Sequence, residues 1–122
     1  MRLKLLDGEF AVCKLDSLVE IDLKDDFVFV AKTDEELSLV CRADKIPKGT
    51  IAAEIDWKAL KIEGVLDFSL TGVISTISSA LAENKIPVFV VSTYNTDYVL
   101  VKAASLKGAM AALREIGCIV IE

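Results

Sequence analysis

Residues 57–101 contain the groups best suited to chemistry in this chain. A strand-like segment at 57–63 is followed by a glycine-bearing turn, DFSLTG at 67–72, and then by an amphipathic stretch of helical length. This order places the N-terminus of a helix beside the end of a strand. The free N–H groups and the dipole at such a helix end can hold a small carboxylate. The predicted chemistry is therefore binding, and no comparable segment indicates catalysis.

The residue types present disfavour catalysis and metal binding. There is no histidine, which removes the commonest general base and the commonest metal ligand. The three cysteines, Cys13, Cys41 and Cys118, are far apart and show no CxxC spacing. Cys41 and Cys118 lie in apolar runs, which is typical of buried thiols. We therefore expect a protein that is not an enzyme and that carries no metal or cofactor.

Composition and charge narrow the class of protein further. The net charge is −5 and the 14 Lys and Arg residues are scattered, whereas a nucleic-acid binder shows a basic face. Charges interrupt every apolar run before the roughly 18 residues that a membrane helix needs, and the first ten residues do not resemble a secretory signal. We expect a cytoplasmic protein that binds neither nucleic acid nor membrane.

The second half of the chain predicts a βαββαβ order, which makes the fold α+β and ferredoxin-like. Thr71 and Ser105 are expected to cap two helices, and Asn84 and Gly117 to end them. The helices are predicted from apolar residues at helical spacing and the strands from apolar runs. The predicted strands are 57–63, 88–93, 98–102 and 118–121, and the predicted helices are 71–83 and 105–116.

The first half resembles a degenerate copy of the second. Its hairpin at 27–40 aligns without a gap with the hairpin at 88–101, so that residues 33–36 fall opposite residues 94–97. We predict two tandem units, a degenerate domain (1–55) and a complete domain (56–122). The alternative is that any two hairpins share this pattern.

Other segments of the first half are less regular. Strands are expected at 3–6 and 10–15, and residues 16–25 offer only a short or irregular helix. Residues 43–56 are expected to link the halves, and the first half is expected to borrow a strand such as 118–121. An uninterrupted apolar strand at 88–91, in a chain that is 53% hydrophobic, predicts a homodimer or higher oligomer because helices cover only one face of a ferredoxin-like sheet.

The segment DFSLTGVISTISSALAENKIPVFVVSTYNTDYVLV, residues 67–101, resembles the C-terminal unit of small tandem-ACT proteins. Those proteins are related to the regulatory ACT domains of aspartate kinase and to the CASTOR arginine sensors. The motifs that carry the resemblance are LTG at the helix start, LAENKI at the helix end and the STYNTDYVLV hairpin. The resemblance covers residues 57–113 well and 27–47 more loosely.

In that family, amino-acid ligands lie at an interface between ACT units, between a helix start and a neighbouring turn. The resemblance implies a ligand site in two elements. The residues of this site are Asp67, Phe68, Ser69, Leu70, Thr71, Gly72, Val73 and Ile74, together with Thr93, Tyr94, Asn95 and Asp97. The N–H groups of 71–74 would bind a carboxylate, Gly72 would let the backbone approach it, and Asp97 or Asp67 would pair with an amine. The arginine sensors have an acid where Leu70 stands, so arginine itself is not implied.

These residues also have purely structural interpretations. Gly72 can serve tight helix–strand packing, and Thr71 can be a helix cap. Asn95 and Asp97 are common turn residues. Tyr94 can be an exposed aromatic or a pocket wall.

Three classes of function remain to be compared. The first is a regulatory module that binds an amino acid or similar small metabolite and acts through a partner protein. The second is a ligand-free module for dimerisation or protein interaction. The third is an enzyme or RNA binder on a ferredoxin-like frame, which we set aside. Residues 64–72 hold no Arg, Lys or Cys for a phosphate or metal site, and only Tyr98 and Phe89 could stack on RNA bases.

Overall fold

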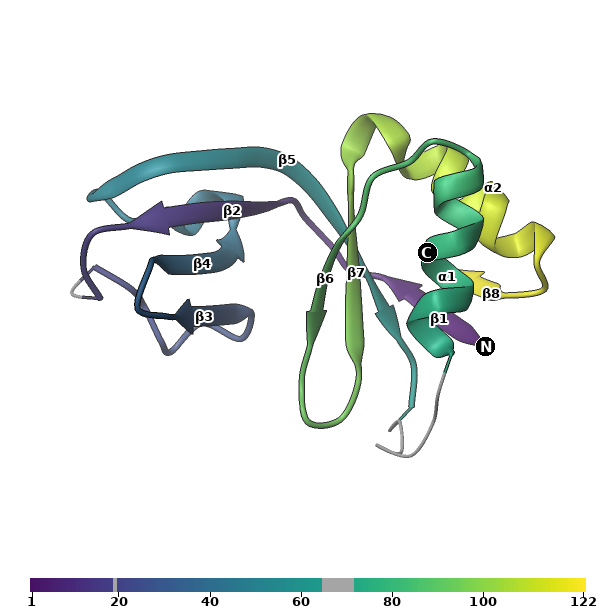
Figure 1. Ribbon diagram of the computed structural model, residues 1–122, viewed down its shortest axis with the longest axis horizontal. Coiled ribbons are helices and arrows are strands. Elements are labelled where there is room, and N and C mark those ends of the chain that lie inside the picture. Colours follow the sequence, from purple (N-terminus) through teal and green to yellow (C-terminus); the bar gives the residue numbers. More distant parts are fainter. Residues whose placement is uncertain (19, 65–71) are drawn as a thin grey trace. The chain divides into compact units, whose positions relative to one another are not determined.

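The computed structural model describes residues 1–18, 20–64 and 72–122 (Figure 1). They form two compact units. The helical unit consists of Met1–Asp7 with Lys58–Glu122, and the strand unit consists of Gly8–Trp57. Strand β5 (Thr50–Ile62) begins in the strand unit and ends in the helical unit. The predicted division into domains 1–55 and 56–122 stays a prediction, and the first seven residues group with the helical unit.

The helical unit has the βαββαβ order predicted from the sequence, and its fold is α+β and ferredoxin-like. Its sheet has the strand order β8-β1-β5-β7-β6. The end of β5 is followed by α1 (Val73–Glu83), β6 (Phe89–Ser92), β7 (Asp97–Lys102), the 3₁₀ turn η2 (Ala103–Ser105), α2 (Leu106–Glu115) and β8 (Ile119–Ile121).

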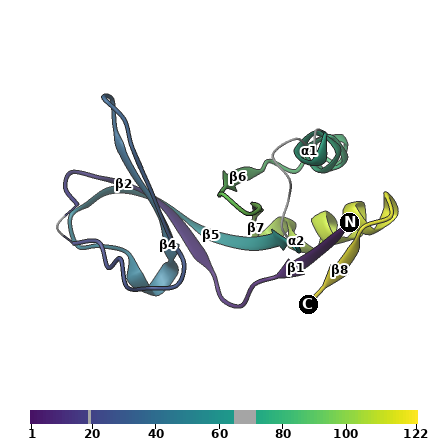
Figure 2. The ribbon, with the colours of Figure 1, turned by 90° about the horizontal axis from the view of Figure 1, so that it is seen from below.

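The N-terminal strand β1 (Arg2–Leu5) lies between β5 and β8. It pairs antiparallel with β5, with Leu3 opposite Ile62, and parallel with β8, with Leu3 opposite Val120. The first and last strands of the chain therefore lie side by side in the helical unit (Figure 2). The last strand does pair with a strand from the first half, as expected, but that strand belongs to the helical unit.

Helices α1 and α2 pack their apolar stripes against this sheet. The sheet contributes Leu3, Leu60, Ile62, Val99, Val101 and Val120, and the helices contribute Ile77, Leu81, Ala109, Met110, Ala112 and Leu113. Their apolar residues recur at helical spacing, and burying such a stripe is what stabilises short helices. Ile116, predicted on this stripe, follows the end of α2 and is 46% exposed.

The structure corrects one of the two predicted N-caps. The N-cap of α1 is Gly72, at φ 81°, and not Thr71. Ser105 is the N-cap of α2 as predicted, but its side chain makes no capping hydrogen bond. Asn84 ends α1, and Gly117, at φ 96°, follows α2. Glycine is favoured there because other residues are strained at positive φ.

The strand unit has the strand order β3-β4-β2-β5. Its elements are β2 (Phe10–Leu15), β3 (Val28–Lys32), β4 (Leu37–Arg42), the 3₁₀ turn η1 (Ala43–Lys45) and the first part of β5. The described residues of 16–25 form turns, so the short helix expected there was wrong. Residues 50–56, expected to be a linker, pair with β2 as strand, with register shifts near both ends. This pairing is long-range, and the local turn residues did not reveal it.

One face of the strand unit carries its own small core. The buried side chains are Ala11, Cys13, Leu15, Leu37, Leu39 and Cys41. Ile21, in the connection 16–26, and Ile46, in the connection 43–49, pack against this cluster. Irregular connections therefore take the place that helices occupy in the helical unit.

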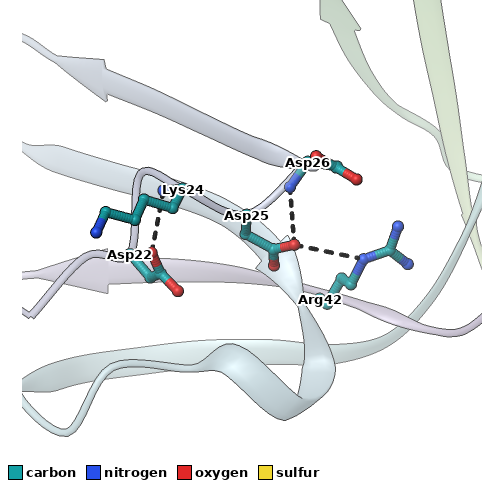
Figure 3. Close-up of polar contacts among 5 residues, drawn as sticks. All are labelled: Asp22, Lys24, Asp25, Asp26 and Arg42. Atoms are coloured by element: carbon teal, nitrogen blue, oxygen red, sulfur yellow. Dashed lines mark hydrogen bonds and ion pairs between the residues drawn. The ribbon is translucent and has the colours of Figure 1, made fainter.

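An arginine anchors one of these connections (Figure 3). The Arg42 Nε lies 3.9 Å from the Asp25 Oδ1, and the Asp26 N–H donates to the same oxygen at 2.8 Å. The Arg42 guanidinium also lies 5.5 Å from the ring centroid of Phe10 and 5.9 Å from that of Phe27. Cation–π contact and the carboxylate together fix the end of the connection before β3.

The hairpins β3–β4 and β6–β7 have closely similar geometry. Thr33 donates its N–H to Glu36 O at 2.9 Å, and Thr93 donates its N–H to Thr96 O at 2.8 Å. A 3₁₀ turn follows each second strand. Thr33 therefore corresponds to Thr93, one residue away from the predicted alignment with Tyr94. The predicted reading of the first half as a degenerate copy stays a prediction.

Candidate functional site

Among the described residues, the start of α1 has no side-chain cap. Its N-cap is Gly72, and the first turn contains no acidic residue. Thr76 donates both its N–H and its Oγ1 hydroxyl to Gly72 O, at 2.9 and 2.8 Å. Val73 and Ile74 are half-buried and pack against the core of the helical unit. The positive end of the helix dipole is thus not neutralised by a carboxylate in the first turn.

The turn between β6 and β7 is fixed by Thr93. Its Oγ1 hydroxyl donates to Thr96 O at 3.0 Å and accepts the Thr96 N–H at 3.3 Å. Tyr94, at the tip of this turn, is 81% exposed, and Asn95 is exposed as well. Asp97 is half-buried at the start of β7, opposite Ser92. The turn therefore presents an aromatic ring, an amide and a carboxylate on a rigid hairpin.

Thr96, which sequence reasoning missed, places this turn in the helical unit. It is 5% exposed, and its hydroxyl donates to Ile62 O at 2.8 Å. Ile62 is the last residue of β5, and Gly64 follows it at φ 87°. The turn thus lies beside the strand end that leads towards α1. No local signal separates Thr96 from other turn threonines, because its partner is 34 residues away.

The predicted site residues fall into two groups. Asp67, Phe68, Ser69, Leu70 and Thr71 lie outside the described residues. Of the remainder, Gly72, Val73 and Ile74 form the start of α1, and Thr93, Tyr94, Asn95 and Asp97 form the β6–β7 turn. The hydrogen bond from Thr96 to Ile62 O holds the β6–β7 turn residues beside the end of β5. Their joint role as a ligand site stays a prediction.

The cysteine thiols are buried, as predicted for Cys41 and Cys118, and Cys13 is buried too. Burial, together with the smaller effects of neighbouring Cys13, Asp25 and Asp44, raises the pKa of the Cys41 thiol to about 12. Burial also raises the pKa of Cys13. Because the thiolate is the nucleophile, neither of these two thiols is activated at neutral pH.

Other sites in the described residues are less well formed. An open depression of about 210 Å³ lies on the strand unit. Its lining includes Val12, Lys14, Glu36, Ser38, Ala52 and Glu54. In residues 1–18, 20–64 and 72–122 no group of three or more His, Cys, Asp or Glu side chains could hold a metal ion. No helix in that part of the chain has the length and apolarity to cross a membrane.

The family model of the ACT domain matches residues 52–115, and a model of an N-terminal domain family matches residues 8–49. The chain belongs to the ACT domain family. The first match spans the end of β5, α1, the β6–β7 hairpin and α2, which are the elements that carry the predicted site. It also confirms the resemblance found in the sequence.

Solved structures share the fold of the chain. A protein from Agobacterium tumefaciens is 31% identical, with a TM-score of 0.87, over 98% of this chain and 91% of that chain. A protein of unknown function from Vibrio cholerae, described as a possible transport protein, is 19% identical, with a TM-score of 0.72, over 91% of this chain and 85% of that one.

The regulatory subunit of aspartate kinase from Thermus thermophilus, in its ligand-free form, has the same fold. It is 13% identical, with a TM-score of 0.63, over 93% of this chain and 95% of that one. No curated protein matches the chain.

Proposed function

We propose that this chain is a non-catalytic regulatory ACT protein that binds an amino acid or a similar small metabolite and acts through a partner protein. The observation that carries the proposal is the ACT match over the elements holding α1 and the β6–β7 turn. The start of α1, which no side chain of the described residues caps, supports it, since a ligand carboxylate would accept hydrogen bonds from the free N–H groups of the first turn. Asp97 supplies a counter-charge for an amine.

The fixed position of the turn supports the same proposal. The Thr96 hydroxyl on Ile62 O and the Thr93 hydrogen bonds hold the turn without help from a ligand. A preorganised site loses less entropy on binding than a mobile one. We further propose a homodimer in the cytoplasm as the working form.

A thermal-shift screen against the twenty amino acids, followed by calorimetry, tests ligand binding. A ligand that binds only the folded state at 100 times its Kd adds about 2.7 kcal/mol to the free energy of unfolding. Asp97→Ala should weaken an amine-bearing ligand by about 1–3 kcal/mol. Glu35→Ala, in the corresponding turn of the strand unit, is the matched control and should leave affinity unchanged.

Gly72→Asn tests the approach of the backbone to the ligand. Asparagine tolerates the left-handed conformation better than other residues with a Cβ, and, chain neighbours aside, no atom of the described residues lies within 4 Å of the position that the added Cβ would occupy. We expect lost binding with a nearly unchanged melting temperature. If no amino acid raises the melting temperature or gives a calorimetric signal, the ligand-free interaction module is favoured. If both site variants keep full affinity for a ligand, the site lies elsewhere.

A further inference from the structure

The two units differ in how they cover the strand that follows their hairpin, which is β6–β7 in the helical unit and β3–β4 in the strand unit. In the helical unit this strand is β8, and its Val120 is 7% exposed because it packs in the core that α2 completes. In the strand unit the corresponding strand is the first part of β5. Its connection from β4, residues 43–49, contains the 3₁₀ turn η1 but no α-helix.

An apolar stripe is exposed on this part of β5. Ala53 pairs with Cys13, so its side chain lies on the face that carries the core of the strand unit. Ile51 and Ile55 each adjoin the regularly paired residues 52–54, and alternation from these residues directs both side chains to the face of Ala53. Ile51 is 57% exposed, Ile55 is 49% exposed and Ala53 is exposed too. We call Ile51, Ala53 and Ile55 the β5 stripe.

The connection 16–26 lies on the same side of the sheet, because its Ile21 packs against the core there. It exposes two further apolar side chains, Leu18 at 50% and Leu23 at 73%. Its exposed charges are four acids and one lysine, namely Asp16, Glu20, Asp22, Asp26 and Lys24, whereas Asp25 pairs with Arg42. The connection 43–49 adds Asp44, Lys45 and Lys48. The apolar surface therefore has a rim that is acidic on balance.

We propose that the β5 stripe receives an amphipathic helix of a partner protein, apolar on one face and flanked by lysine or arginine. This inference rests on the proposed function, in which the chain acts through a partner. A helix is the element that covers the corresponding strand of the helical unit. The acidic rim selects a basic flank, since opposite charges steer and specify such contacts. A second copy of this chain would bring a second acidic rim against the first.

Two fluorescent synthetic peptides of about 14 residues, long enough for a short helix, test the proposal by anisotropy. Both carry the same leucine face, one flanked by lysines and the other by glutamates. The lysine peptide should bind the full chain about tenfold more tightly than its twin, and salt should reduce the difference. Ile51→Glu should weaken it about tenfold, because it places a charge in the apolar contact.

Ile119→Glu is the matched control, since Ile119 is a 56% exposed isoleucine on β8, and it should leave peptide affinity unchanged. Binding of neither peptide, equal binding of both, or binding insensitive to Ile51→Glu would overturn the proposal. A concentration-dependent dimer in sedimentation that Ile51→Glu abolishes would assign the stripe to a second copy instead. The titrations need no amino acid, and Ile51→Glu leaves the helical unit unaltered. Failure here is therefore distinguishable from failure of ligand binding.

Discussion

The hairpins β3–β4 and β6–β7 share a backbone geometry but are covered in different ways. Each turn begins with a threonine that accepts or donates the turn hydrogen bonds, and each second strand runs into a 3₁₀ turn. Val28 and Val88 both pack against a core on the same relative face. Helices complete the core around β6–β7, whereas Ile21 and Ile46 complete it around β3–β4. A sheet can therefore keep its hairpin geometry when its helical cover is replaced by loops.

The difference has a physical consequence for each unit. Helices bury wide apolar stripes, so the helical unit gains hydrophobic free energy on both α1 and α2. The strand unit buries less and adds polar anchors, among them Arg42 with Asp25. It also leaves the β5 stripe exposed, which is where a partner is proposed to bind.

The largest expected effect is the difference in stability lost when a core side chain is removed from a helix or from the loop that takes a helix's place. Leu81→Ala removes a fully buried side chain from α1, and we expect it to lower the free energy of unfolding by about 3 kcal/mol. Ile21→Ala, in the connection that stands in the place of α1, should cost about 1 kcal/mol, because Ile21 is only half-buried. Urea denaturation followed by circular dichroism measures both. Equal losses would mean that the connection contributes as much as the helix.

A smaller effect on stability is expected at the fourth residue of the two hairpin turns, which is Thr96 in β6–β7 and Glu36 in β3–β4. Thr96→Val removes the buried hydroxyl that donates to Ile62 O, and it should cost about 1–3 kcal/mol. Glu36→Val is the matched change in the other turn. Because Glu36 is exposed, it should cost no more than about 0.5 kcal/mol. If Glu36→Val proved the costlier change by denaturation, the long-range bond of Thr96 would not be what fixes its turn.

The last difference changes stability only at alkaline pH and concerns Cys41, whose counterpart in the helical unit is Val101. The folded pKa of Cys41 is raised from 9.0 to about 12 by burial. The unfolded thiol ionises first as pH rises, so the stabilisation is fully present below pH 9 and is lost between pH 9 and about 12. Cys41→Val should flatten this part of the stability profile. Unchanged profiles for the variant and the parent chain would show that Cys41 does not cause the loss.

The sequence by itself determined most of the local structure and the family. Helical spacing located α1 and α2, apolar runs located the hairpins, and the motifs from LTG to STYNTDYVLV indicated the ACT fold that the comparisons bear out. Such signals are local, because they depend on residues within a few positions of one another. The candidate site could be predicted only as far as these motifs reached.

Tertiary structure decided what depends on partners distant in the chain. It placed β1 between β5 and β8, made residues 50–56 a strand along β2, and tied Thr96 to Ile62. It also shifted the correspondence of the hairpins by one residue, since Thr33 and Thr93 hold equivalent turn bonds. Strand pairing joins residues tens of positions apart, and the choice among possible partners is made by burial of the whole sheet face, which no local window contains.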